Sequence, residues 1–190
     1  HVGLGSGTQL GLAVGVALAR LYRLDLSVRE IALVVQRGQR SGIGAGAFEL
    51  GGFLVDGGKG ACDEPPPIVS RVPFPAHWRV ILVLERATHG LHGEIENAAF
   101  QALPAFPEML AGHLCRLMLM QALPALAQCD IERFGEAIGE LQRITGDYFA
   151  PVQGARFASP AVADALAWIE TQGIAGVGQA PVERLRAGVE

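Results

Sequence analysis

The hydrophobic residues of this chain predict helices at both ends and short strands between them. Residues 9–22 are apolar on nearly every side, which is typical of a buried helix, and Ser6 or Thr8 is expected to cap it. Ser27 with Glu30 three residues later forms a capping-box pattern, so a second helix is predicted from there to about Gln36. A short helix and an apolar strand over 52–56 are expected within the glycine-rich stretch 39–60.

The second half of the chain begins with the strongest strand pattern and then becomes helical. Residues 79–85 read RVILVLE, a continuous apolar run between charged ends. Four helices are expected after it: 94–103, 107–128 with a break near Pro124, 131–149, and a last helix to Gln172 capped by Ser159. Residues 174–177 are expected to return as a strand. This order predicts an α+β fold with helices segregated from a small antiparallel sheet.

Composition and charge exclude several classes of protein. The chain has 190 residues, half of them hydrophobic, and a net charge of −4, which excludes an intrinsically disordered chain. The acidic balance and the 6% aromatic content argue against a nucleic-acid partner. Three cysteines without a CxxC pair argue against a zinc or disulfide framework and favour the cytoplasm. The apolar run 10–19 is too short to span a membrane, so no membrane partner is expected.

Glycine is the compositional anomaly, because its 25 residues are nearly twice the average share of about 7%. The first cluster contains Gly3, Leu4, Gly5, Ser6, Gly7 and Thr8, directly before the first helix. Glycine allows backbone to approach a ligand, and amides at a helix N-terminus attract anions, so this segment is a candidate phosphate loop. The sequence lacks the GK[ST] of a P-loop, and Thr8 replaces the third glycine of GxGxxG. A plain turn before a core helix is the alternative.

The ionisable candidates lie in or directly beside the second glycine cluster, residues 38–60. They are Arg37, Arg40, Glu49, Asp56 and Lys59. Arginines there can hold phosphate or carboxylate, and a carboxylate can hold a metal ion on pyrophosphate. The alternative is that all five are solvated loop charges. Gly42 to Ala47 also match the GxGxxA variant of a dinucleotide fingerprint, but too few residues separate Ala47 from the strand to form a crossover helix, which disfavours that reading.

Taken together, these segments resemble the GHMP kinase superfamily. Its phosphate loop, GLGSS before a long helix, corresponds to Gly3 to Gly7, and its SGxD segment followed by a glycine pair corresponds to Ser41 to Gly44 with Gly51 and Gly52. Gly44 stands where those kinases carry a catalytic Asp, and Leu33 falls near their magnesium-binding Glu. An ATP-dependent small-molecule kinase is therefore the second reading of function.

The closer resemblance is to the beta-ribofuranosylaminobenzene 5'-phosphate synthase family, a non-kinase branch. Three blocks carry it: HVGLGSGTQL, RGQRSGIGAGAFELGGFLVDGG and GLHGEIENAAF, together about half the chain. The resemblance implies decarboxylating transfer of phosphoribose from phosphoribosyl pyrophosphate to 4-aminobenzoate. CO2 and pyrophosphate leave, in a step toward tetrahydromethanopterin. It also implies Mg2+ with the diphosphate substrate.

Within that resemblance, residue type and loop position assign the site. Residues 3–8 are expected to bind phosphate, with Arg37, Arg40, Ser41 and Gly42 on the substrates and Asp56 and Glu49 as catalytic carboxylates; no metal is expected to be held by the protein alone. Residues 1–75 would be part of an N-terminal GHMP-like domain. Residues 76–190 would be a C-terminal domain, rich in helices and containing the small sheet. The chain is also expected to be a fragment that lacks the family's N-terminal segment and the superfamily's third glycine-rich motif. A third hypothesis of function is therefore a fragment that is inactive on its own. Self-association as a homodimer is expected.

Overall fold

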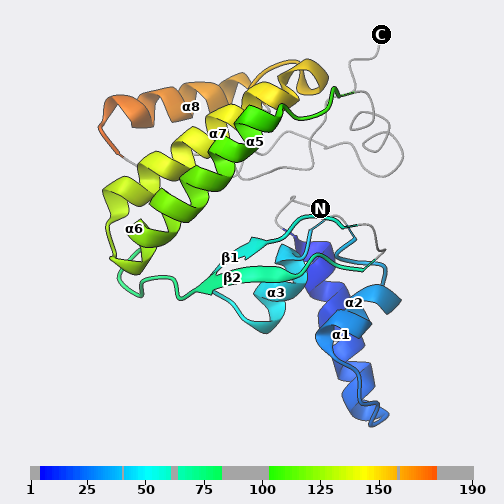
Figure 1. Ribbon diagram of the computed structural model, residues 1–190. Helices are drawn as coiled ribbons and strands as arrows, with labels where there is room; N and C mark the ends of the chain where they lie inside the picture. The colour runs from blue at the N-terminus through cyan, green and yellow to red at the C-terminus, as the bar shows by residue number, and fades with distance from the viewer. Residues whose placement is uncertain (1–4, 40, 61–63, 83–102, 158, 175–190) are drawn as a thin grey trace. The chain divides into compact units, whose positions relative to one another are not determined.

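The computed structural model describes residues 5–39, 41–60, 64–82, 103–157 and 159–174. The chain divides into two compact units, His1–Ala76 and His77–Glu190, and each is described by itself. Helices dominate both units, and a two-stranded antiparallel sheet accompanies them in the first (Figure 1). The predicted α+β class is confirmed.

The first unit is built around helix α1 (Ser6–Leu21), which contacts α2 (Val28–Val34) and α3 (Ile43–Glu49). Its buried side chains are small or aliphatic: Leu12, Ala19, Ile31, Ala32 and Ala45. Gly15 makes the close approach of α1 and α2 feasible, because a Cβ at that position would overlap Ile31 Cγ2. The core is therefore held by close helix contact more than by large side chains.

Helix α2 begins as the sequence predicts. The Glu30 amide donates to Ser27 Oγ at 3.2 Å, and the Ser27 amide donates to Glu30 Oε2 at 2.8 Å, which completes the capping box. The helix ends at Val34, slightly before the predicted end. The turn that follows uses left-handed backbone at both Gln36 (φ 53°) and Gly38 (φ 80°).

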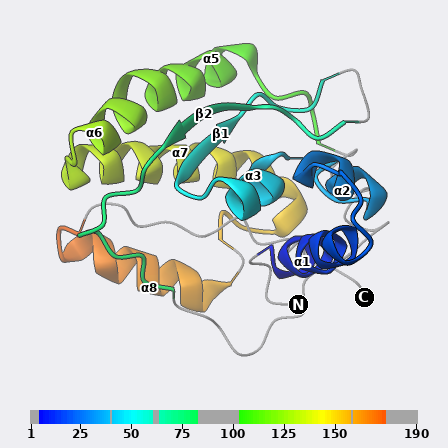
Figure 2. The same cartoon turned by 90° about the horizontal axis from the view of Figure 1, so that it is seen from below.

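The sheet pairs β1 (Phe53–Asp56) with β2 (Ile68–Val72), Phe53 lying opposite Val72. The β1 prediction is confirmed, but β2 is a strand that the sequence pattern missed. Figures 1 and 2 show both strands beside α3. The sheet therefore belongs to the first unit, whereas the sequence placed it in the second half of the chain.

The predicted strand over 79–85 is wrong over its described part, 79–82. Val80, Ile81 and Leu82 are 70%, 85% and 58% exposed, and they pair with no strand among the described residues. An apolar run becomes a strand only where a neighbouring strand accepts its backbone hydrogen bonds. Residues 83–85 lie outside the described residues.

In the second unit, α5 (Glu108–Leu117), a π-helical turn (Met118–Ala122) and α6 (Leu123–Ala127) follow one another as a single rod along α7 (Ile131–Gln153) (Figures 1 and 2). Helix α8 (Pro160–Thr171) begins at Ser159, whose hydroxyl oxygen accepts the Val162 amide. The predicted helices 107–128, 131–149 and 160–172 are confirmed. The break predicted near Pro124 is not present: the rod continues through that residue, with a π turn, Met118–Ala122, just before it.

Two further predicted elements of this half lie mostly outside the described residues. The expected helix 94–103 lies outside the described residues except for Leu103, which is not helical. The expected strand 174–177 is described only at Ile174, which is not in a strand.

Residues Glu108–Ala127 are long and apolar enough to cross a membrane by length and composition alone. In this fold Leu117, Ala122, Ala125 and Leu126 on that rod are buried. A helix packed into a protein core meets the same length and composition test, so the rod is weak evidence for membrane insertion.

Candidate functional site

The candidate phosphate loop leads directly into α1. Gly5 has left-handed backbone (φ 70°), and its carbonyl accepts the amides of Thr8 at 3.0 Å and Gln9 at 3.1 Å. Neither Ser6 nor Thr8 caps the helix with its side chain, so that prediction is wrong. The reason is that backbone at Gly5 closes the turn by itself. Helix geometry leaves the amides of Ser6 and Gly7 without an intrahelical acceptor, which is the arrangement that binds anions.

The predicted catalytic residue Asp56 binds three groups of its own chain. Its Oδ2 accepts the Ser41 hydroxyl at 2.6 Å and the Gly42 amide at 2.8 Å, and its Oδ1 accepts the Gly58 amide at 3.1 Å. The half-buried carboxylate thus joins the end of β1 to the start of α3. The structure therefore brings together Ser41, Gly42 and Asp56, three of the predicted site residues.

Gly42 and Gly44 are positions where a side chain would not fit. A Cβ on Gly42 would overlap the Pro66 carbonyl oxygen, and a Cβ on Gly44 would lie 2.9 Å from Thr8 Cγ2. At Gly42 helix α3 packs against the segment before β2, and at Gly44 it packs against the first turn of α1. Both glycines are required by tertiary contact and not by backbone conformation, since neither has a positive φ.

Gln9 is a residue of this region that the sequence analysis missed. Its side-chain amide donates a partly buried 2.8 Å hydrogen bond to the Gly44 carbonyl, 35 residues along the chain. The bond joins the candidate phosphate loop to the candidate substrate loop. No local pattern reveals such a pair, because glutamine in the first turn of a helix is unremarkable by itself.

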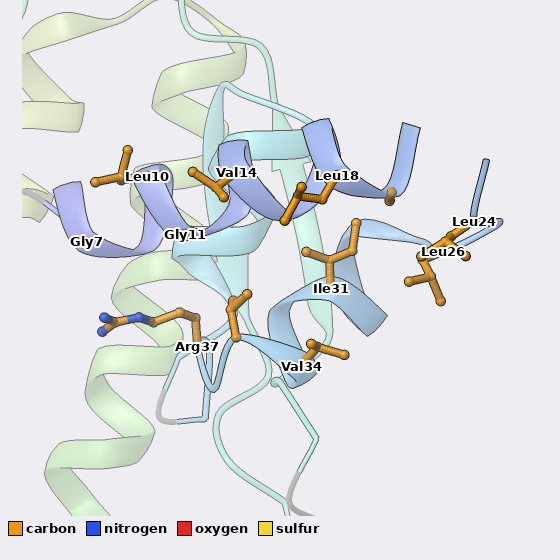
Figure 3. Close-up of a pocket in the computed structure, with 13 residues that line it drawn as sticks. Gly7, Leu10, Gly11, Val14, Leu18, Leu24, Leu26, Ile31, Val34 and Arg37 are labelled. Carbon is orange, nitrogen blue, oxygen red and sulfur yellow. The ribbon is translucent and has the colours of Figure 1, made fainter. Parts of the chain in front are cut away.

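An apolar groove of about 540 Å³ runs along α1 and α2, and the candidate Arg37 lies at one end of it (Figure 3). The sequence pattern predicted that α1 would be buried, but Leu10, Val14 and Leu18 on the groove face are 68%, 52% and 49% exposed. The buried residues of the helix are Leu12 and Ala19, and Ala19 also lines the groove. In the described residues the helix is thus packed on one side only.

The Arg37 side chain extends toward the end of the groove where Gly7 lies (Figure 3). Its stem passes α1 at Gly11, where an added Cβ would lie 4.0 Å from Arg37 Cγ. The guanidinium is exposed, and within the described part of the chain no carboxylate forms an ion pair with it. Among the described residues Arg37 therefore presents a positive charge without a paired carboxylate near the first turn of α1.

The remaining candidates are not gathered into this arrangement. Glu49 is exposed at the last turn of α3, about 9 Å along the helix axis from Ile43 at a rise of about 1.5 Å per residue. Lys59 is exposed three residues after Asp56. Gly3, Leu4 and Arg40 lie outside the described residues.

Metal binding by this region would depend on a ligand that brings the ion. The described residues contain no group of three or more His, Cys, Asp or Glu side chains that could hold a metal ion. A divalent cation that arrives on a diphosphate needs only one or two protein carboxylates. Asp56 fits that limited role, since its Oδ1 accepts one hydrogen bond from the described residues and keeps a lone pair.

Comparison with known proteins connects this arrangement to a family. Residues 1–52 match the model described as GHMP kinases N terminal domain. The chain is 39% identical over 156 residues to a beta-ribofuranosylphenol 5'-phosphate synthase of Archaeoglobus fulgidus, a match that covers 76% of this chain and 49% of that protein. Proteins of the same name from Methanothermobacter thermautotrophicus and Methanocaldococcus jannaschii are 36% and 39% identical, each covering 75% of this chain and 47% of the relative. The chain thus spans about half the length of these curated relatives.

Proposed function

Because the chain belongs to the family of the beta-ribofuranosylphenol 5'-phosphate synthases, within the GHMP kinase superfamily, we propose that it acts in the phosphoribosyl transfer that this family name describes. The donor in this proposal is phosphoribosyl pyrophosphate and the acceptor is a para-substituted benzoate. The identity of 36–39% over three quarters of the chain is the observation that carries the proposal. Such an enzyme is a decarboxylating pentosyltransferase.

The proposed reaction is balanced without an oxidant or a reductant. The bond from ribose C1 to the diphosphate oxygen breaks, and its electron pair leaves with pyrophosphate. The ring carbon that carried the carboxylate bonds to C1. The electron pair of the ring–carboxylate bond then restores the aromatic ring as CO2 departs.

The acceptor is either 4-aminobenzoate or 4-hydroxybenzoate. The sequence resemblance implies an aminobenzene product, whereas the names of the relatives describe a phenol. An amino group and a hydroxyl group both donate electron density to the ring carbon opposite them. Both acids therefore suit the same attack on ribose C1, and they differ in one substituent that the enzyme must recognise.

In this proposal the first turn of α1 binds the diphosphate through the amides of Ser6 and Gly7, with the helix macrodipole adding to the attraction. Arg37 binds a phosphate or the acceptor carboxylate, since a guanidinium can donate two parallel hydrogen bonds to either. Asp56 faces the positive charge that develops on the ribosyl centre. Mg2+ bound to the diphosphate would neutralise part of the leaving group's charge.

Two alternatives compete with this proposal. Many ATP-dependent kinases use a base to deprotonate an alcohol, and Gly44 occupies the position of that base, which weakens the kinase reading. An added side chain there would meet Thr8, which disfavours a kinase. The second alternative is a piece of such an enzyme without activity alone, and the span of about half the relatives' length keeps it open.

Calorimetry separates these readings. We expect the chain, titrated in the presence of Mg2+, to bind phosphoribosyl pyrophosphate more tightly than ATP. Tight ATP binding without any response to phosphoribosyl pyrophosphate would instead support the kinase. No measurable binding of either ligand would support the alternative that the chain is inactive alone. Release of CO2 from carboxyl-labelled 4-aminobenzoate or 4-hydroxybenzoate by the whole protein would identify the acceptor.

The proposal also includes a cytoplasmic location and a homodimer. The exposed apolar side chains Leu10, Val14 and Leu18 on one face of α1 are the surface that favours association. Sedimentation velocity over a range of protein concentrations tests the dimer, and a constant monomeric mass would contradict it.

A further inference from the structure

The first turn of α1 and the first turn of α3 are in direct contact through Thr8 and Gln9 on one side and Gly44 on the other. Gln9 Nε2 donates to the Gly44 carbonyl at 2.8 Å, and the side chain of Thr8 fills the space where a Cβ on Gly44 would stand. The hydrogen bond is partly buried, and Gln9 and Thr8 are both half-buried. One polar and one steric contact therefore hold the same pair of turns together.

These two turns carry the two predicted ligand-binding segments. The turn of α1 presents the amides of Ser6 and Gly7, and the turn of α3 begins at Gly42, whose amide is held by Asp56. The contact at Gly44 therefore sets the distance between the phosphate loop and the loop that contains Ser41. A single chain of contacts runs from α1 through α3 to the end of β1.

We infer that Gln9 is a positioning residue, which fixes the phosphate loop relative to the substrate loop through the Gly44 carbonyl, and that Gly44 is glycine to admit Thr8. The inference rests on the proposed function for what the two loops bind. Group transfer depends on this distance, because a displacement of about 1 Å between reacting groups can reduce a rate by about 100-fold. The inference also gives Gly44 a positive role in this chain beyond the absence of a kinase carboxylate.

The first test removes the hydrogen bond and keeps the shape of the side chain. Gln9→Met is close to glutamine in length and has no donor. We expect its affinity for pyrophosphate and for phosphoribosyl pyrophosphate to fall by about fivefold, the equivalent of one typical hydrogen bond. The measurement is calorimetry at a temperature where thermal melts show both proteins fully folded. Gln128→Met, on an exposed residue of the second unit, is the matched control and should bind as the wild type does.

The second test is a double-mutant cycle on the steric contact between Gly44 and Thr8. Gly44→Ala brings a methyl group within 2.9 Å of Thr8 Cγ2, and Thr8→Ser removes that carbon, leaving Cβ at 3.5 Å as the nearest remaining atom of the side chain. We expect Gly44→Ala to bind pyrophosphate several-fold more weakly than the wild type. Gly44→Ala should reduce the affinity for pyrophosphate less in the Thr8→Ser variant than in the wild type, because the overlap with Thr8 Cγ2 is gone. A merely local effect of alanine in a helix would be the same in both backgrounds.

The outcomes separate the inference from the proposed function. A wild-type chain that binds phosphoribosyl pyrophosphate, together with a Gln9→Met variant that binds equally well, would overturn the inference and leave the function standing. Equal effects of Gly44→Ala in both backgrounds would refute the role of Thr8. A folded wild-type chain that binds neither pyrophosphate nor phosphoribosyl pyrophosphate would overturn the proposed function, and the role of Gln9 with it.

Discussion

The Ser41 hydroxyl donates a 2.6 Å hydrogen bond to Asp56 Oδ2, the same oxygen that accepts the Gly42 amide. Ser41 precedes α3 and Asp56 ends β1, so a single carboxylate oxygen joins two elements across 14 and 15 residues of chain. A carboxylate with two donors on one oxygen is oriented before any ligand arrives. The orientation matters for either role of Asp56, as a charge facing the substrate or as a support for the loop.

Replacement of Asp56 by asparagine separates these two roles. The asparagine side chain would retain one acceptor oxygen and present an NH2 group, so the donors now bound by the two carboxylate oxygens could not all be satisfied. We expect a loss of about 1–3 kcal/mol in the free energy of unfolding, as for a hydrogen-bonded group left without its partner. Chemical denaturation measures it. Ser41→Ala removes one of the same bonds, and its effect should be non-additive with Asp56→Asn.

Turnover by the whole protein then tests the chemical role of Asp56. If Asp56 only supports the loop, Ser41→Ala and Asp56→Asn should reduce turnover in proportion to their effects on stability and ligand affinity. A much larger loss of turnover in Asp56→Asn would show that its charge acts on the substrate. Undiminished turnover in Asp56→Asn would remove the residue from the catalytic candidates.

Gly42 is expected to tolerate no side chain at all. A Cβ there would overlap the Pro66 carbonyl oxygen, which is backbone and cannot rotate away. We expect Gly42→Ala to lower the free energy of unfolding by about 1–3 kcal/mol, the usual cost of overpacking. Gly60→Ala is the matched control, since nothing lies within 4 Å of a Cβ at that glycine. Equal thermal melts for the two variants would contradict the close contact.

Arg37 is expected to contribute to anion binding. It is exposed, and a hydrogen bond to a charged group typically contributes about 1.5–3 kcal/mol, so Arg37→Ala should weaken pyrophosphate binding by about 10-fold or more. Arg37→Lys should recover only part of the loss, because lysine keeps the charge without the two-pronged geometry. Arg20→Ala, at the far end of α1, is the control. Calorimetry that shows equal affinity for Arg37→Ala and Arg20→Ala would exclude Arg37 from the site.

The capping box of α2 predicts a dependence of stability on acid pH. Hydrogen bonds from the Ser27 hydroxyl and amide to Glu30 lower the pKa of that carboxyl in the folded chain below its ordinary value. A lowered pKa means that the contribution is complete above the unfolded pKa of about 4.3 and is lost as pH falls through the folded value. Thermal melts of the wild type and Glu30→Gln should therefore differ at pH 7 and converge near pH 3.

A control variant makes that comparison specific. Glu136→Gln changes an exposed carboxylate on α7, outside the capping box, and serves as the matched substitution. A wild-type advantage over Glu30→Gln that persisted unchanged at pH 3 would show that the stabilisation does not depend on the charge. Ser27→Ala should lose about 0.5–2 kcal/mol at pH 7, as is usual for an N-cap serine.

Local patterns in the sequence determined the elements that form from near neighbours. The capping box at Ser27, the cap at Ser159 and the long amphipathic pattern from Ile131 each involve residues three or four apart, and all three are present in the structure. The strand before Asp56 and the glycine turn before α1 were also predictable. The sequence likewise supplied the family resemblance, since that depends on residue order alone.

Contacts between distant residues decided the rest. The described residues 80–82 are more apolar than Ile68–Val72, yet of these two segments only Ile68–Val72 is a strand, because β1 supplies its partner. In β2 the side chains of Ile68, Ser70 and Val72 are half-buried and the two between them are exposed. The sequence analysis did not predict this strand, because three prolines directly before it are typical of a connecting segment. The pairs Ser41–Asp56, Gln9–Gly44 and Gly42–Pro66 join residues 15, 35 and 24 positions apart. Pairing and close packing at such separations depend on how the elements assemble, so only the tertiary structure could show that these loops are held together.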